Sequence, residues 1–152
     1  MKVVGAISDT HGMLRPSAIA ALQGCDAIVH AGDIGRLEVP CGLSALGPLT
    51  AVRGNVDLEW AQALAQTAEF ELAGRRFFVI HDLNLLAINP HETGIDVVIS
   101  GHSHQPAIRR RADVLFVNPG SGGRRRFRLP IAVARIEVSD NRISARLIEL
   151  TE

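Results

Sequence analysis

Six short apolar runs, rich in valine, isoleucine, leucine and phenylalanine, recur along this chain, and each ends abruptly at a polar residue or a glycine. The runs cover residues 2–7, 27–31, 49–53, 76–80, 96–99 and 114–117. Short apolar runs bounded by turn residues are typical of buried β-strands. Short helices are predicted between the first three runs, over residues 16–23 and 39–46. This strand–helix–strand spacing indicates βαβ units and a largely parallel sheet.

The second half of the chain favours hairpins. Residues 70–72 and 76–80 flank Ala73-Gly74-Arg75, and residues 131–138 and 142–149 flank Ser139-Asp140-Asn141. Strands joined by such short turns pair antiparallel. We therefore expect a single domain over residues 1–152, of the α/β class (α+β in some schemes), built as a four-layer-like β-sandwich of mixed sheets flanked by helices.

Composition excludes several classes of protein. The chain has 152 residues, 47% of them hydrophobic and 21% charged, which suits a folded domain and not a disordered one. Its net charge is zero, so nothing global indicates a nucleic-acid or membrane binder. Cys25 and Cys41 form no C-x-x-C pair, and no stretch has the length of a membrane span. The expected location is the cytoplasm, without a membrane partner.

Residues able to bind metal follow five of the six runs, and the sixth run leads into Asn118-Pro119-Gly120-Ser121. In chain order, the candidate ligands are Asp9, His11, Asp33, Asn55, His81, His102 and His104. In open α/β folds, ligands bind at the carboxyl ends of the strands. We therefore expect these side chains to meet at one rim of the sheet system.

The seven donors are nitrogen and oxygen atoms, with no thiolate. Mixed imidazole and carboxylate ligands suit manganese, iron, zinc or nickel, of which we expect manganese. Seven donors exceed the need of one tetrahedral ion but suit two divalent ions that share a carboxylate. Two carboxylates against two such ions leave a positive centre that attracts a phosphoryl group, and metal binding yields hydroxide at neutral pH.

The ordered set Asp9-x-His11, Gly32-Asp33, Gly54-Asn55, His81 and Gly101-His102-Ser103-His104 resembles the motifs of the calcineurin-like metallophosphoesterases, in particular the small bacterial phosphodiesterase (YfcE-type) branch. The resemblance implies the metallo-dependent phosphatase fold. It implies one metal held by Asp9, His11, Asp33 and His104. It implies a second held by Asp33, Asn55, His81 and His102, with Asp33 bridging. Asp33 and Asn55 are then the expected catalytic residues, acting with a hydroxide that bridges the ions.

Two positions depart from the family pattern. Many members carry a histidine directly after the Gly-Asn pair, placed to protonate the leaving group, but here that residue is Val56. Many also follow the His81 position with Gly-x-His, whereas here Asp82-Leu83-Asn84 follows. The pattern therefore supplies no general acid, and we expect metal binding to be retained and alkyl esters to be turned over slowly.

Other polar residues have more ordinary interpretations. His30 is expected to be a core or supporting histidine, and His91 a solvated loop residue. Asp57 could orient a ligand, although turns carry such residues routinely. The arginine clusters at 109–111 and 124–128 lack interleaved aromatic residues beyond Phe127, which is more typical of solvated hairpin ends than of a nucleic-acid surface.

The hypothesis is therefore a metal-dependent phosphoric ester hydrolase that acts on a small phosphodiester or another phosphate ester. Two alternatives stay open. One is a nuclease that uses the arginine clusters, and the other is a catalytically weak scaffold, like the retromer subunit that shares this fold. The physiological substrate, the native metal pair and the oligomeric state, a homo-oligomer included, are not determined by the sequence.

Overall fold

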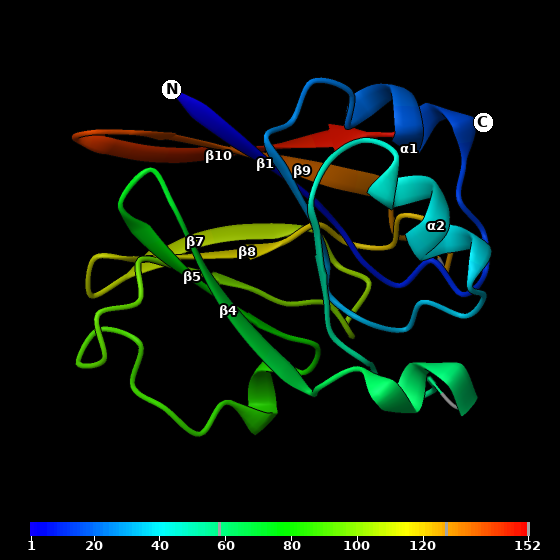
Figure 1. Cartoon of the computed structure of the whole chain (residues 1–152), viewed down its shortest axis with the longest axis horizontal. Helices are drawn as coiled ribbons and strands as arrows, with labels where there is room; N and C mark the ends of the chain where they lie inside the picture. The colour runs from blue at the N-terminus through cyan, green and yellow to red at the C-terminus, as the bar shows by residue number, and fades with distance from the viewer. Residues whose placement is uncertain (58, 127, 152) are drawn as a thin grey trace.

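Two five-stranded mixed sheets face each other in the computed structural model, which describes residues 1–57, 59–126 and 128–151 (Figure 1). The first sheet has the order β10-β9-β1-β2-β3. Its strands are β1 (Lys2–Ile7), β2 (Ala27–His30), β3 (Leu49–Ala51), β9 (Ala132–Ser139) and β10 (Arg142–Glu149). The first three strands are parallel, while β9 runs antiparallel to both β1 and β10.

The second sheet has the order β4-β5-β6-β8-β7. Its strands are β4 (Thr67–Leu72), β5 (Arg75–Ile80), β6 (Val97–Ile99), β7 (Ala107–Arg111) and β8 (Val114–Asn118). Strands β5, β6 and β8 are parallel, and β4 and β7 pair antiparallel at the edges. The predicted mixed sandwich and both predicted hairpins are confirmed.

Strand β7 is the element that the apolar pattern does not predict. It is an edge strand whose last three residues are exposed arginines, and Ile108 is its contribution to the core between the sheets. Edge strands often carry charged side chains, which discourage pairing with other chains and also hide the strand from an apolar pattern. Strand β4 begins at Thr67, three residues before the predicted start at residue 70. The exposed Glu69 and Glu71 alternate with its inward side chains, so the strand contains no continuous apolar run.

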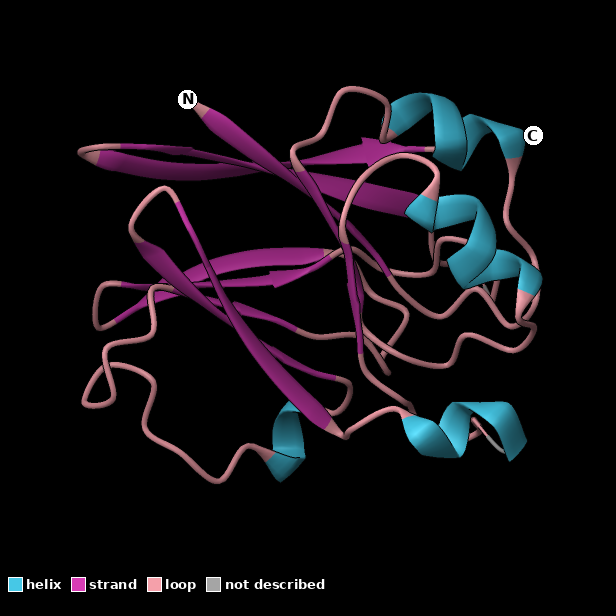
Figure 2. Cartoon of the chain, viewed as in Figure 1, coloured by secondary structure: helices cyan, strands magenta, loops and turns pink. Residues whose placement is uncertain are grey.

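Side chains alternate between two apolar layers on β1. Val4 and Ala6 point into the core between the sheets, whereas Val3 and Ile7 point toward the helices. Helices α1 (Pro16–Ala21) and α2 (Glu38–Ser44) cover this outer face (Figure 2). A five-residue turn, η1 (Glu59–Ala63), brings Trp60 against the same cluster.

The outer face of the second sheet carries Phe78, Ile80 and Val98, and Leu86 and Ile88 of the chain beyond β5 pack against it. This segment includes a short turn, η2 (Leu83–Leu85). Among the described residues, no helix is long and apolar enough to cross a membrane. The loops at the carboxyl ends of β1, β2, β5 and β6 hydrogen-bond to one another, so they gather at one rim.

Candidate metal centre

The seven candidate ligands occupy the loops that follow β1, β2, β3, β5 and β6. Five of them adopt positive φ: Asp9 (54°), His11 (46°), Asp33 (57°), His102 (72°) and His104 (62°). Residues other than glycine rarely enter this left-handed region, and each does so at a cost of about 1–3 kcal/mol. The other positive-φ residues of this kind in the described chain lie at hairpin turns, at Ala73, Ala112 and Asp113. Backbone strain is thus concentrated at this rim, as is typical of a functional site.

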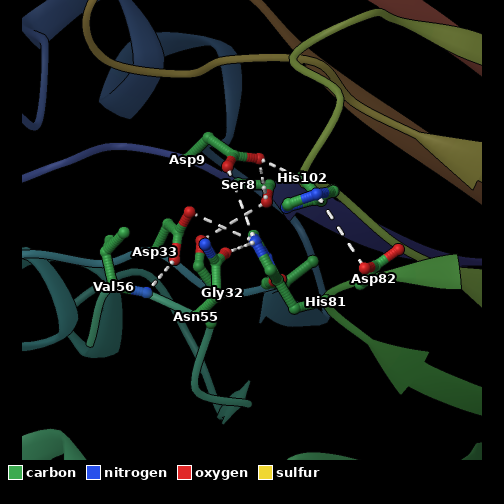
Figure 3. A network of polar contacts seen from close by, with 12 residues as sticks. Ser8, Asp9, Gly32, Asp33, Asn55, Val56, His81, Asp82 and His102 are labelled. Carbon is green, nitrogen blue, oxygen red and sulfur yellow. Dashed lines mark hydrogen bonds and ion pairs between the residues drawn. The ribbon is translucent and has the colours of Figure 1, made fainter. Parts of the chain in front are cut away.

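Each of the two carboxylates has one oxygen held by the protein and one directed into the centre. Asp9 Oδ2 accepts hydrogen bonds from Ser8 Oγ (2.7 Å) and from the backbone N–H of His102 (3.0 Å). Asp33 Oδ1 accepts from the backbone N–H of Val56 (3.1 Å). The remaining oxygens, Asp9 Oδ1 and Asp33 Oδ2, face the histidines (Figure 3).

Glycines allow these loops to approach so closely. A Cβ at Gly54 would overlap the Asp33 carboxylate, and a Cβ at Gly101 would overlap Ser8 Oγ and Asp9 Oδ2. Both glycines precede a candidate ligand directly. Any side chain here would push a ligand-bearing loop away from the carboxylate that it supports.

His81 is held in one tautomer. Its Nδ1 lies 2.7 Å from the carbonyl oxygen of Ala31, which can only accept, so Nδ1 carries the proton. In the neutral ring, Nε2 then presents a lone pair to Asn55 Oδ1 (3.1 Å) and to Asp33 Oδ2 (3.2 Å), which are acceptors too. These contacts are satisfied by a metal cation among the three atoms, or by a second proton on the ring at Nε2.

The donor set fits divalent metal ions. Asp9 Oδ1 and His11 Nε2 are buried and find no hydrogen-bond partner among the described residues, although a buried polar atom normally has one. Asp9 Oδ1 lies 3.3 Å from His104 Nε2, and Asp33 Oδ2 lies 3.9 Å from His11 Nε2. Two ligands of one ion lie about 3–3.6 Å apart when each bond is about 2.1 Å. The Asp9–His104 spacing falls in this range, and the Asp33–His11 spacing is a few tenths of an ångström longer.

Two groups of ligand atoms overlap in this centre. Asp9, His11 and His104 form one, and Asp9, Asp33 and His81 form the other. Asp33 Oδ2 lies within 4 Å of both His11 and His81, which the family resemblance assigns to different ions. Asp9 Oδ1 also lies between these histidines, at 4.0 and 3.9 Å. Both carboxylates are therefore close enough to serve two ions.

His102 is positioned differently from the other candidates. Its ring lies edge-on to His81 with centroids 5.3 Å apart, but its Nε2 faces Asp82 Oδ2 at 3.8 Å, on the outer side of the centre (Figure 3). The His11 and His104 rings stack at 5.4 Å. The structure therefore brings all seven candidates to one rim, with His102 at its outer edge.

The electrostatics of the centre favour positive charge. Burial raises the pKa of Asp9, against the opposing hydrogen bond from Ser8. Burial would also raise the pKa of Asp33, but the hydrogen bond and charge of His81 lower it overall. The pKa of His81 is raised despite burial, through its hydrogen bond to Asp33 and the charges of both carboxylates. Perturbed pKa values of this kind cluster at functional sites.

His30 supports the centre and offers it no ligand atom. Its Nδ1 accepts from the N–H of Gly32 (3.0 Å), so Nε2 carries the proton and donates to Thr10 Oγ1 (2.9 Å). Thr10 donates in turn to the carbonyl of Ile34 (2.8 Å). Burial lowers the pKa of His30 to about 3, which keeps the ring neutral and this network intact. The network ties the loop of Asp9 and His11 to the loop of Asp33.

Two supporting residues were not assigned to the centre from the sequence. Arg126, taken for part of a solvated cluster, places Nη1 3.5 Å from His104 Nε2 because the glycine-rich loop before it folds across β1. Asp57, for which a ligand-orienting role was an alternative to an ordinary turn residue, is buried and accepts from the N–H groups of Ile34 (2.9 Å), Gly35 (3.2 Å) and Gly54 (2.8 Å). Its place two residues after Asn55 was the available signal.

Removing the Asp57 carboxylate should loosen the loops that carry Asp33 and Asn55. We expect Asp57→Ala to lower the free energy of unfolding by about 3 kcal/mol, since three backbone N–H groups lose a charged acceptor. The exposed turn residue Asp140 is the matched control, and Asp140→Ala should change stability by less than about 0.5 kcal/mol. Denaturant unfolding measures both variants. Equal effects of the two substitutions would contradict an Asp57 clamp, in which this carboxylate holds the two loops together.

Comparisons with known proteins agree with this architecture. Residues 1–141 match the family model described as the calcineurin-like phosphoesterase superfamily domain. The chain is 33% identical to a probable metallophosphoesterase of Methanothermobacter thermautotrophicus, with 96% of this chain and 91% of that protein covered. It is 31% identical to the phosphodiesterase YfcE of Escherichia coli K12, covering 80% of this chain and 79% of that protein.

Solved structures share the fold. The YfcE structure from E. coli superposes with a TM-score of 0.68 at 23% identity, covering 98% of this chain and all of that one (100%). Vps29 of Chaetomium thermophilum superposes with a TM-score of 0.78 at 16% identity and 99% coverage of both chains. Vps29 of Entamoeba histolytica, solved in complex with Zn²⁺, has a TM-score of 0.73 at 19% identity, with 97% and 98% covered.

Proposed function

The chain belongs to the calcineurin-like phosphoesterase superfamily, and we propose that it hydrolyses phosphodiesters with two divalent metal ions held at the candidate metal centre. The observation that carries this proposal is the pair of buried carboxylates, Asp9 and Asp33, whose inner oxygens lie beside imidazole nitrogens. Asp9 Oδ1 has no hydrogen-bond donor among the described residues. The proposed ligands are Asp9, His11, Asp33, Asn55, His81, His102 and His104. Manganese is the proposed metal, with iron, zinc and nickel as alternatives.

The residues of the chain have distinct tasks in this proposal. Bound divalent ions would supply hydroxide at neutral pH and neutralise the phosphoryl oxygens. Ser8 and the N–H groups of Val56 and His102 hold the outer carboxylate oxygens, so that the inner ones stay aimed at the centre. Arg126, beside His104, adds a fixed positive charge at the rim where a phosphoryl group would enter.

Diesters with acidic leaving alcohols are the proposed substrates. Val56 stands where many family members carry histidine, and its side chain has no proton to give. A leaving group that departs readily as its anion does not need one. Asp57 does not replace the missing acid, because its two oxygens already accept three backbone N–H groups. The phosphodiesterase activity in the name of the E. coli relative supports the same substrate class.

Reconstitution with manganese tests both parts of the proposal. We expect elemental analysis of protein saturated with Mn²⁺ to give close to two ions per chain, and this form to hydrolyse bis(4-nitrophenyl) phosphate. Zn²⁺, Ni²⁺ and Fe²⁺ reconstitution under the same conditions would rank the metals. One ion or none per chain would refute the dinuclear centre.

A scaffold is the competing proposal, because Vps29 structures share this fold. The same measurements separate the two. A protein that binds two ions and turns over no phosphomonoester or diester of a broad panel would favour the scaffold, whereas turnover that depends on added metal would favour the hydrolase.

A further inference from the structure

A cavity of about 320 Å³ opens beside the candidate metal centre, on the outer face of the second sheet. It begins at Asp82 and His102 and extends over β7 and β8 as far as Arg109 and Phe116. Ligand pockets measure about 300–1,000 Å³, so this one has room for a single small ring system and not for a length of polymer. Its residues are absent from the proposed ligand set except for His102.

Strand pairing builds the floor of the cavity. Arg109 lies directly opposite Phe116 on the neighbouring strand, and Ala107 lies opposite Asn118. Ile108 points into the core between the sheets, so the side chains of residues 107 and 109 point outward. Phe116 packs with the apolar side chains on the outer face of the second sheet, such as Phe78 and Val98, and is half-buried. Part of its ring therefore faces the cavity. Arg109 and the small Ala107 therefore frame an aromatic surface.

Opposite charges, those of Asp82 and Arg109, lie at the two ends of the cavity, and the apolar surface between them favours a neutral ring. Asp82, at the end near the centre, has one oxygen engaged with the N–H of Asn84 and the other 3.8 Å from His102 Nε2. Its charge repels a second anionic group there. Leu83, which is 41% exposed, adds an apolar wall, and Arg109 at the far end can stack on a ring.

We propose that this cavity binds one aromatic substituent of the phosphodiester, a nucleobase or an aryl ring, while the phosphoryl group lies at the metal centre. The inference rests on the proposed function, because the phosphoryl group must be held beside His102. An aromatic ring would lie over Phe116 and Arg109 and bury apolar area that a methyl group cannot.

Phosphonates that differ in one substituent test the proposal. Methylphosphonate, phenylphosphonate and thymidine 5′-methylphosphonate share the phosphoryl group, and the last two distinguish an aryl ring from a nucleobase. We expect the manganese-loaded protein to bind at least one aromatic ligand about 3–10-fold more tightly than methylphosphonate, as stacking contacts of this kind predict. Titration calorimetry measures the dissociation constants.

Two variants test whether the cavity causes the preference for aromatic ligands. Ala107→Ile should fill the cavity and abolish the preference, and Arg109→Ala should reduce it by about 2–5-fold. Arg111→Ala is the matched control, because Arg111 lies two residues further on the same strand and face and does not line the cavity. It should leave the preference unchanged. Phenylphosphonate should also shift the amide resonances of residues 107, 109 and 116 in the metal-free protein.

The outcomes separate this proposal from the proposed function. A preference for aromatic ligands that is lost in Ala107→Ile and retained in Arg111→Ala supports the cavity assignment. If that preference is found and no diester is hydrolysed, only the proposed hydrolysis fails. Equal affinities for methyl and aromatic ligands, or a preference that survives both Ala107→Ile and Arg109→Ala, would overturn the cavity assignment whether or not diesters are hydrolysed.

Discussion

Asp33→Asn should lower phosphodiester turnover by more than about 1,000-fold, since the metal ions contribute several kcal/mol to transition-state stabilisation and each 1.36 kcal/mol is tenfold in rate. The substitution is nearly isosteric, so a simple loss of volume does not explain the effect. The N–H of Val56 requires an acceptor and binds Asp33 Oδ1 at 3.1 Å. The amide oxygen of an asparagine must take that place.

The amide nitrogen is then forced into the centre, where Asp33 Oδ2 now faces His81 Nε2 at 3.2 Å. An amide N–H₂ donates hydrogen bonds and does not ligate a metal. We therefore expect Asp33→Asn to retain fewer than two manganese ions per chain by elemental analysis, with little change in the unfolding of the metal-free protein. Kinetics on bis(4-nitrophenyl) phosphate give the turnover.

His30→Gln is the comparison for this variant. His30 supports the same loops through Thr10 and Gly32 but offers no ligand atom, and losing such support typically costs about 10–100-fold. Losses of equal size in Asp33→Asn and His30→Gln would argue against a carboxylate that holds the metals directly.

Val56 should make turnover depend steeply on the leaving group. A positioned general acid is worth about 10²–10⁴-fold, and its value grows as the leaving alcohol becomes more basic. The turnover rate of aryl diesters should therefore fall little without the acid, whereas alkyl diesters should be hydrolysed very slowly. The backbone N–H of Val56 binds Asp33 (Figure 3), and Val56 is 49% exposed, so position 56 lies at the solvent-facing edge of the centre.

Val56→His should flatten this dependence by placing an imidazole within reach of the ester oxygen. The measurement is log kcat against leaving-group pKa for one diester series, run on both proteins at one pH with metal content checked. Leu147→His is the control, because it adds a half-exposed imidazole on β10, at the far edge of the first sheet. A flat dependence in the unmodified protein would mean that another group, such as the exposed His91, already supplies the proton.

Much of the fold could be predicted because its information is local. The buried strands β1, β2, β6 and β8 are short apolar runs with polar ends, and this pattern is visible without knowledge of their neighbours. Strand β7 could not be predicted in this way, because pairing with β8 and not its own composition makes it a strand. Edge strands with charged faces lose the local pattern on which such predictions depend.

The sequence by itself determined which residues are candidates for the metal centre and that they share one rim, because each follows a strand and parallel strands end at the same edge. Only the tertiary structure decided how the donors are aimed. The bond from the N–H of His102 to Asp9 joins residues 93 positions apart, and the Asp57 clamp joins the loops of two strands. The left-handed backbone at Asp9 and Asp33 and the cavity over Phe116 have the same origin. They arise from contacts between distant segments, which hold conformations that the local sequence alone does not favour.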